Sequence, residues 1–166
     1  MDYIAETTKV VNLLPPKDIS AAAHSVAYVS LKNYDHVDFI VTMGATGAIG
    51  SSKAVTLKEA KDTSGTSAAN LPIGHYYKNQ AALGSSSVAN DTYTKTSVAS
   101  SGATFNMIAS TNNITYIIPV DSQKLTQSFD CVGIGIATTS AAALCGAVAV
   151  LSRGRYKSDN PPSALS

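Results

Sequence analysis

A chain of 166 residues is long enough for one domain with a hydrophobic core. Its 12 Lys and Arg against 11 Asp and Glu leave a formal net charge of +1, which argues against the strongly basic surface of a nucleic-acid binder. Charged residues make up only 14% of the chain, against roughly 25% in a typical soluble domain. A surface with so few charged residues is poorly protected against association. We therefore expect neighbouring subunits to cover some of its faces.

The first segment, residues 1–23, is expected to be an extended arm. Pro15 and Pro16 stop any helix there and force extended backbone. The start of the chain lacks the basic residues and apolar stretch of a signal peptide.

A series of short strands is predicted after the arm. The period of two is clearest where Val37, Phe39 and Val41 share one face of a strand. The expected strands are residues 25–31, 37–42, 54–60, 104–108, 114–120, 129–136 and 144–151, with a further strand opening at Tyr76 and Tyr77.

Three connections have their own predictions. Residues 61–74 are small and polar and are expected to form a surface loop, whereas residues 83–101 give no clear assignment. A single helical turn capped by Asp121 is expected at residues 121–125.

Short strands at regular spacing, with no long amphipathic helix, predict an all-β fold: an antiparallel β-sandwich or a jelly-roll-like barrel. We divide the chain into an N-terminal arm (1–23), a β-sandwich domain (24–153) and a C-terminal tail (154–166) without a packing signal.

A charge-free run from Cys131 to Leu151 is long enough for a transmembrane helix. Its small and branched residues favour a hairpin of two buried strands instead, so we expect no membrane contact. Cys131 and Cys145 are expected to be free thiols, although a disulfide stays open if the two strands pair side by side.

Glycine-rich segments suggest a cofactor site only superficially. Gly44, Gly47 and Gly50 precede Lys53, but the spacing is not that of a phosphate-binding loop. Gly133 and Gly135 lack the third glycine of a dinucleotide fingerprint, and glycine in a strand more often marks a close approach of another backbone. We expect no cofactor-binding residues.

The three histidines, His24, His36 and His75, have no neighbouring His or Cys at metal-ligand spacing, and we expect them at the surface or at strand edges. No Gly-x-Ser-x-Gly motif is present, although a Ser, His and Asp that converge only in the fold stay an open alternative. We predict no catalytic or metal-binding residues, and therefore no enzyme. Arg153 and Arg155 are expected to form a partner-facing polar rim, or to be plain solvated residues after the last strand, rather than to contact nucleic acid.

Four segments together resemble a known family. They are Asn12–Asp18, Tyr28–Tyr34, Ala147–Tyr156 and Pro161–Leu165. In this order they resemble small virion structural proteins of tailed bacteriophages, notably capsid decoration (cement) proteins.

The resemblance implies a module that binds the major capsid protein on the outside of the shell, often as a trimer or dimer, and stabilises the shell. It implies a location on the virion surface after assembly in the host cytoplasm, with the two termini as contact points. It carries over no catalytic residue.

Two other functions remain open. The protein could belong to the neck, tail or head fibre of the same kind of particle. It could also be a carbohydrate-binding module whose stacking face is made by Tyr76, Tyr77, Tyr93 and Tyr116.

Overall fold

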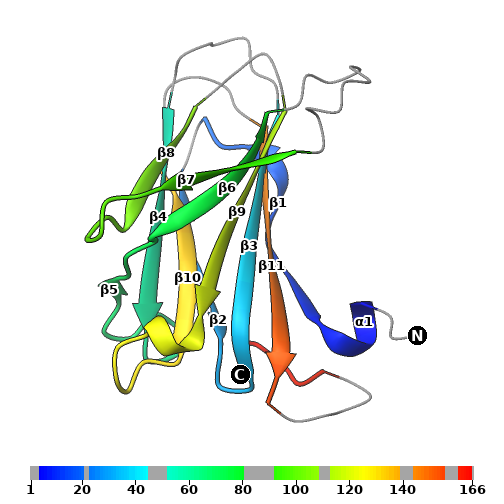
Figure 1. Cartoon of the computed structure of the whole chain (residues 1–166), viewed down its shortest axis with the longest axis vertical. Helices are drawn as coiled ribbons and strands as arrows, with labels where there is room; N and C mark the ends of the chain where they lie inside the picture. Colours follow the sequence, from blue (N-terminus) through cyan, green and yellow to red (C-terminus); the bar gives the residue numbers. More distant parts are fainter. Residues whose placement is uncertain are drawn as a thin grey trace.

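The protein folds as two antiparallel β-sheets that pack face to face as a sandwich, which Figure 1 shows. This computed structural model describes residues 4–20, 23–44, 52–80, 92–108, 113–138, 144–155 and 161–165. The predicted all-β antiparallel sandwich is confirmed. The alternative of a jelly-roll-like barrel is not adopted, because the two sheets stay separate and do not close on each other.

The first sheet has six strands. In spatial order they are β1 (Lys9–Asp18), β11 (Leu144–Gly154), β3 (Tyr34–Met43), β9 (Ile114–Asp121), β6 (His75–Gln80) and β7 (Tyr93–Ser97).

The second sheet has five strands. They are β2 (His24–Ser30), β10 (Cys131–Ile136) and β4 (Ser52–Ala60), with β5 (Ala69–Asn70) and β8 (Thr104–Ile108) both pairing with β4. A short helix, α1 (Ile4–Thr7), precedes β1, and a 3-10 turn (Ser122–Lys124) follows β9.

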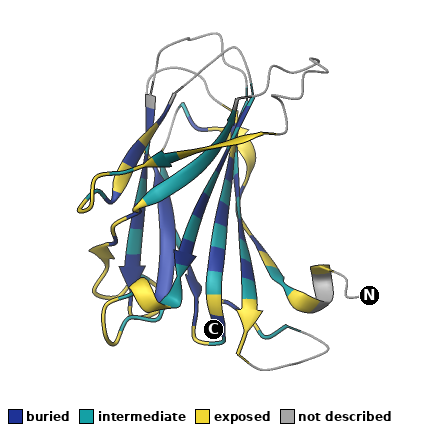
Figure 2. Ribbon diagram, viewed as in Figure 1, coloured by how far each residue is buried: buried dark blue, intermediate teal, exposed yellow. Residues whose placement is uncertain are grey.

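The core lies between the two sheets and follows the predicted alternation. On β3, Val37, Phe39 and Val41 are fully buried, while the residues between them are half-buried (Figure 2). On β10 all six residues are buried, because its other face is also covered. A period of two along each strand therefore places one set of side chains in the core.

The N-terminal segment is extended, as Pro15 and Pro16 predicted, but it is not a free arm. Residues 9–18 pair with β11 and form an edge of the six-stranded sheet, with register shifts on either side of Leu14. Leu14 is 2% exposed and Ile19 is fully buried, so both belong to the core. Main-chain pairing and apolar burial thus join this segment to the sandwich.

The end of the chain is also packed, where a tail without packing was expected. Ala164 is 1% exposed and its carbonyl oxygen accepts a hydrogen bond from the backbone N–H of Ser30 at 2.8 Å. The hydroxyl of Tyr34 donates to the carbonyl oxygen of Pro162 at 2.5 Å. Residues 161–165 are therefore held against the end of the sandwich.

The two strands at 131–151 do not form the expected hairpin. β10 pairs with β2 and β4, whereas β11 pairs with β1 and β3, so the connection between them passes from one sheet to the other. Within the described ranges, the structure contains no helix that is long and apolar enough to span a bilayer.

Two smaller predictions also need correction. The predicted surface loop at 61–74 includes β5 and buries Leu71 and Ile73 in the core. The turn after β9 is present, but the side chain of Asp121 makes no capping hydrogen bond. That carboxylate is engaged by His36 instead.

Candidate functional site

The outer face of the six-stranded sheet carries an apolar belt. Ile40 of β3 lies in register with Val148 of β11 on one side and with Ile117 of β9 on the other, and Tyr77 of β6 continues the row. These side chains are half-buried, although they point away from the core. We define the belt as Val10, Ile40, Tyr77, Ile117, Pro119, Val148 and Val150.

The outer face of the five-stranded sheet is different, because its own chain covers part of it. Tyr28, Ala60 and Cys131 form a small buried cluster there. The Tyr28 ring lies against two glycines. A Cβ added at Gly133 would be 2.9 Å from this ring, and a Cβ added at Gly65 would be 2.8 Å from it. The belt on the other sheet has no such cover among the residues that the structure describes.

A groove of about 380 Å³ borders the belt where β1, β11 and β3 run side by side. Its lining is mainly apolar and includes Leu14, Pro16, Ile40, Leu144 and Val148. Leu144, the first residue of β11, is 58% exposed at one end of the groove. The groove enlarges the apolar surface without adding charged groups.

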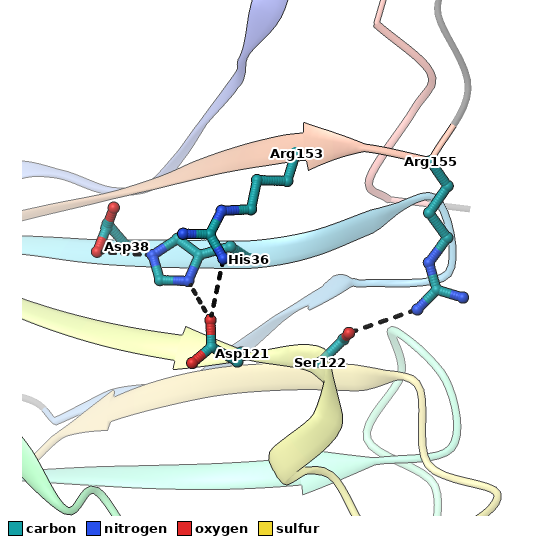
Figure 3. A network of polar contacts seen from close by, with 6 residues as sticks. All are labelled: His36, Asp38, Asp121, Ser122, Arg153 and Arg155. Carbon is teal, nitrogen blue, oxygen red and sulfur yellow. Dashed lines mark hydrogen bonds and ion pairs between the residues drawn. The ribbon is translucent and has the colours of Figure 1, made fainter.

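A polar cluster lies at the end of β9 and beside the start of β3; Figure 3 shows its side chains. Nδ1 of His36 lies 2.7 Å from Oδ1 of Asp121, and Nε2 lies 3.2 Å from Oδ1 of Asp38. Arg153 extends toward Asp121, with Nη1 at 3.9 Å from Oδ1. The cluster therefore brings together residues of β3, β9 and β11.

His36 is engaged at both ring nitrogens. A carboxylate oxygen only accepts hydrogen bonds, so both contacts form together only when both nitrogens carry a proton. The hydrogen bond from His36 is the main cause that holds the pKa of Asp121 below its ordinary value of 3.8; the charges of Lys124 and Arg153 add to it. In this arrangement His36 has no free nitrogen to act as a general base.

The two C-terminal arginines both contact acidic or polar groups. Nε of Arg155 lies 3.0 Å from Oδ1 of Asp35, and its Nη2 donates to Oγ of Ser122 at 3.4 Å. Arg153 is 71% exposed and adopts a positive φ of 54°. The charges of Arg153 and Arg155 are therefore balanced by the neighbouring carboxylates of Asp121 and Asp35.

The other two histidines make no hydrogen bond or ion pair with this cluster, although Asp121 lies near enough to His75 to oppose the lowering of its pKa. Burial is the main cause that lowers the pKa of His24, with a smaller effect of Lys17. Burial also lowers the pKa of His75, whose ring packs edge-on against Tyr77 at 5.3 Å. Among the described residues, no group of three His, Cys, Asp or Glu side chains is placed to hold a metal ion.

The glycine-rich segment before Lys53 lies largely outside the described residues, but Lys53 itself is described. Its side chain is fully buried, on the same face of β4 as Val55 and Leu57. Burial lowers the pKa of Lys53, while Asp18 and Cys145 oppose that shift. Lys53 thus faces the core side of β4, whereas residues 45–51 before it lie outside the described residues.

Both cysteines are free and buried, as predicted. Cys131 lies on the outer side of β10, whereas Cys145 faces the core from β11 in the other sheet. Burial raises the pKa of each thiol to about 11, with a further contribution of Asp130 at Cys131. A disulfide between them would require the strands to pair, and they do not.

The four tyrosines proposed as a stacking face do not share one surface. Tyr76 stacks on Phe105 at 4.1 Å and Tyr116 is 2% exposed, so both face the interior. Tyr77 lies in the belt and Tyr93 is 44% exposed on the edge strand β7. The face predicted for carbohydrate binding is therefore not assembled.

The sequence contained part of the signal for the site. His36 and Asp38 are two residues apart in β3, which places them on one face, although the predicted strand began only at residue 37. The contact with Asp121 depends on how β3 and β9 pair, which no local pattern specifies. The belt was missed because each strand contributes only one or two of its residues.

Comparison with known proteins adds no relative: the chain matches no protein-family model, and no curated protein is significantly similar to it.

Proposed function

We propose that this chain is a structural virion protein that binds the outside of a phage capsid and stabilises the shell. The observation that carries this proposal is the apolar belt on the outer face of the six-stranded sheet. The belt is half-buried and Asp38 lies between Val150 and Pro119 on the same face, and apolar side chains gathered on an outward face in this way suit a protein–protein contact. The resemblance to capsid decoration proteins supplies the partner, which is the major capsid protein.

The polar cluster supports a role in contact rather than in catalysis. Both ring nitrogens of His36 are held by carboxylates, and Arg155 is held by Asp35 and Ser122. Such a network fixes charged groups in defined positions at the border of an apolar face. Charged groups in a rim contribute specificity and orientation more than affinity.

Low overall charge and many copies on one particle fit the same role. A capsid offers repeated sites, so a modest contact per copy becomes strong when several contacts form together. We place the contact with the capsid on the sheet and not at the two termini, because residues 9–18 and Ala164 are part of the sandwich.

Reconstitution tests the proposal. Capsids that lack the protein are incubated with the purified chain, sedimented, and heated until they release their DNA. We expect the chain to sediment with the capsids in many copies and to raise the temperature of release. Absence of co-sedimentation together with unchanged heat resistance would refute the proposal. Few copies per particle would instead indicate a neck, tail or head-fibre component.

A further inference from the structure

We propose that Arg153 and Arg155 form a binding site for a carboxylate group of a protein partner, at the end of the six-stranded sheet where β3 begins and β9 ends. The inference rests on the proposed function in taking the major capsid protein as that partner. It adds the chemistry that the partner presents, which is an Asp or Glu side chain. The site lies in the charged cluster and does not use the belt.

The two guanidinium groups converge on one short segment of the chain. Nη1 of Arg153 lies 3.9 Å from Oδ1 of Asp121, and Nη2 of Arg155 donates to Oγ of Ser122 at 3.4 Å. Asp121 and Ser122 are adjacent at the end of β9, so both arginines reach the same stretch of backbone from the end of β11 (Figure 3). The charge of Lys124 also contributes to lowering the pKa of Asp121, which places a third cation close to this segment.

Arg153 has hydrogen-bonding capacity that the described part of the chain does not use. Its side chain is 71% exposed, and the ion pair with Asp121 is its one polar contact with the described residues. Nδ1 of His36 already holds the same Oδ1 at 2.7 Å, so the arginine makes the second and longer contact with that oxygen. A guanidinium presents a planar fork of N–H donors that matches the two oxygens of a carboxylate. The donors of Arg153 are therefore available to a partner.

The backbone of Arg153 is strained. Its φ of 54° lies in the left-handed region, which costs free energy for any residue with a side chain. The other described non-glycine residues with a positive φ, Ser67 and Ser128, lie in turns, whereas Arg153 lies within β11. An exposed ion pair at 3.9 Å returns little free energy, so it does not account for an arginine at this position. Binding of a partner to the guanidinium supplies a reason for it.

The charges around the site favour a carboxylate over a phosphate. With both nitrogens of His36 protonated, four groups are positive and three are negative: Arg153, Arg155, Lys124 and His36 against Asp35, Asp38 and Asp121. The single positive charge that remains suits one carboxylate, whereas a phosphate monoester carries nearly two negative charges. Nucleic acid requires a strongly basic surface, and the whole chain has a net charge of only +1.

Retention of the purified chain on immobilised poly-L-glutamate, at about 20 mM salt to limit screening, tests the ligand class. Arg153→Gly should bind about 10-fold more weakly than the wild type, because it loses a charge-assisted contact. The matched control is Lys17→Gln, which removes one positive charge from the exposed part of β1 and should bind like the wild type. No retention of the wild type, or equal losses for the two variants, would overturn the site. Tighter retention on immobilised polyphosphate would overturn the choice of a carboxylate.

Thermal unfolding separates the contribution of the backbone from that of the side chain. Arg153→Gly and Arg153→Ala both remove the guanidinium, but only glycine adopts a positive φ without cost. Arg153→Gly should therefore unfold about 2–4 °C above Arg153→Ala, while both bind poly-L-glutamate equally weakly. The same measurement shows that each variant is folded. Equal midpoints would show that the backbone is not strained and would overturn the inference.

Reconstitution with capsids tests the partner. Arg153→Gly should require about 10-fold more protein than the wild type to fill the capsids, whereas Lys17→Gln should not. If both variants fill the capsids as the wild type does, this inference fails and the proposed function stands. If the wild type binds poly-L-glutamate through Arg153 but does not sediment with capsids, the proposed function fails and the carboxylate site stands.

Discussion

Nδ1 of His36 lies 2.7 Å from Oδ1 of Asp121, and this contact joins β3 to β9 at one end of the six-stranded sheet. It links the charged rim to the register that also aligns Ile40 with Ile117. The same strand pairing therefore places both the charged rim and the apolar row on this face of the sheet.

Asp121→Asn should make stability less dependent on pH. A carboxyl group whose pKa is lowered in the folded state stabilises the fold above its unfolded pKa, and this stabilisation is lost as the pH falls through the folded pKa. Because the side chain is 46% exposed, we expect a loss of only about 0.5 kcal/mol in the free energy of unfolding at pH 7.

Urea unfolding at pH 7 and at about pH 2 measures this effect, and the difference between wild type and variant should close at the lower pH. The control is Asp35→Asn, which removes an exposed carboxylate paired with Arg155 and should change little. An equal loss at both pH values would contradict the role of the charged carboxylate.

Cys131 and Cys145 should resist alkylation in the folded protein. Both thiols are buried and have a pKa of about 11, so very little thiolate is present at about pH 8. Iodoacetamide followed by mass measurement should show two modified cysteines in denaturant and almost none without it. Rapid modification of either residue in the folded state would show that its surroundings open easily.

Glu59→Ala should destabilise the segment before β10. The buried carboxylate accepts hydrogen bonds from the backbone N–H and the hydroxyl of Thr126, at 2.8 Å and 2.6 Å. Because Thr126 is exposed, water can replace the lost acceptor, and we expect the loss of both hydrogen bonds to cost about 1–2 kcal/mol in unfolding free energy. Glu59→Gln keeps one acceptor oxygen and should cost less; equal costs would indicate that the hydrogen bonds do not matter.

Leu14→Ala should show that the N-terminal strand belongs to the core. Leu14 is 2% exposed, so its truncation should cost about 2–4 kcal/mol in unfolding free energy. Lys17→Ala on the exposed part of the same strand should cost under about 0.5 kcal/mol. If chemical denaturation gave the same small loss for both, residues 9–18 would act as a dispensable arm.

Gly133→Ala should destabilise the fold more than Gly135→Ala does. A Cβ at Gly133 would lie 2.4 Å from the carbonyl oxygen of Ala27, where the backbone has to move. At Gly135 the nearest atom is a methyl group of Val26 at 2.9 Å, which a side-chain rotation can relieve. Thermal unfolding of the two variants should therefore differ by several degrees, and identical midpoints would show that β2 adapts freely.

Much of the fold was predictable from local pattern. The expected strands at 25–31, 37–42 and 54–60 correspond to β2, β3 and β4, and the alternation in β3 identified its core residues. Gly133 was expected to mark a close approach of another backbone, and Ala27 is that neighbour. These features follow from single strands and need no knowledge of their partners.

The candidate site was less predictable, because it depends on pairing between distant strands. His36 and Asp121 are 85 residues apart, and only the β3–β9 register brings them together. The environment of Lys53 also could not be predicted from its neighbours in the sequence. The sequence placed it beside a glycine-rich loop, whereas its position on the inner face of β4 buries it.

The sequence by itself determined the all-β class, most of the strands and the extended backbone at Pro15 and Pro16, because side-chain alternation and proline geometry act over a few residues, but it did not indicate β1, β5 or β7. Only the tertiary structure decided that β10 and β11 join different sheets and that residues 9–18 and Ala164 pack against the sandwich. Those outcomes depend on which distant main-chain groups pair and which apolar faces pack together. Interactions across the whole chain determine this.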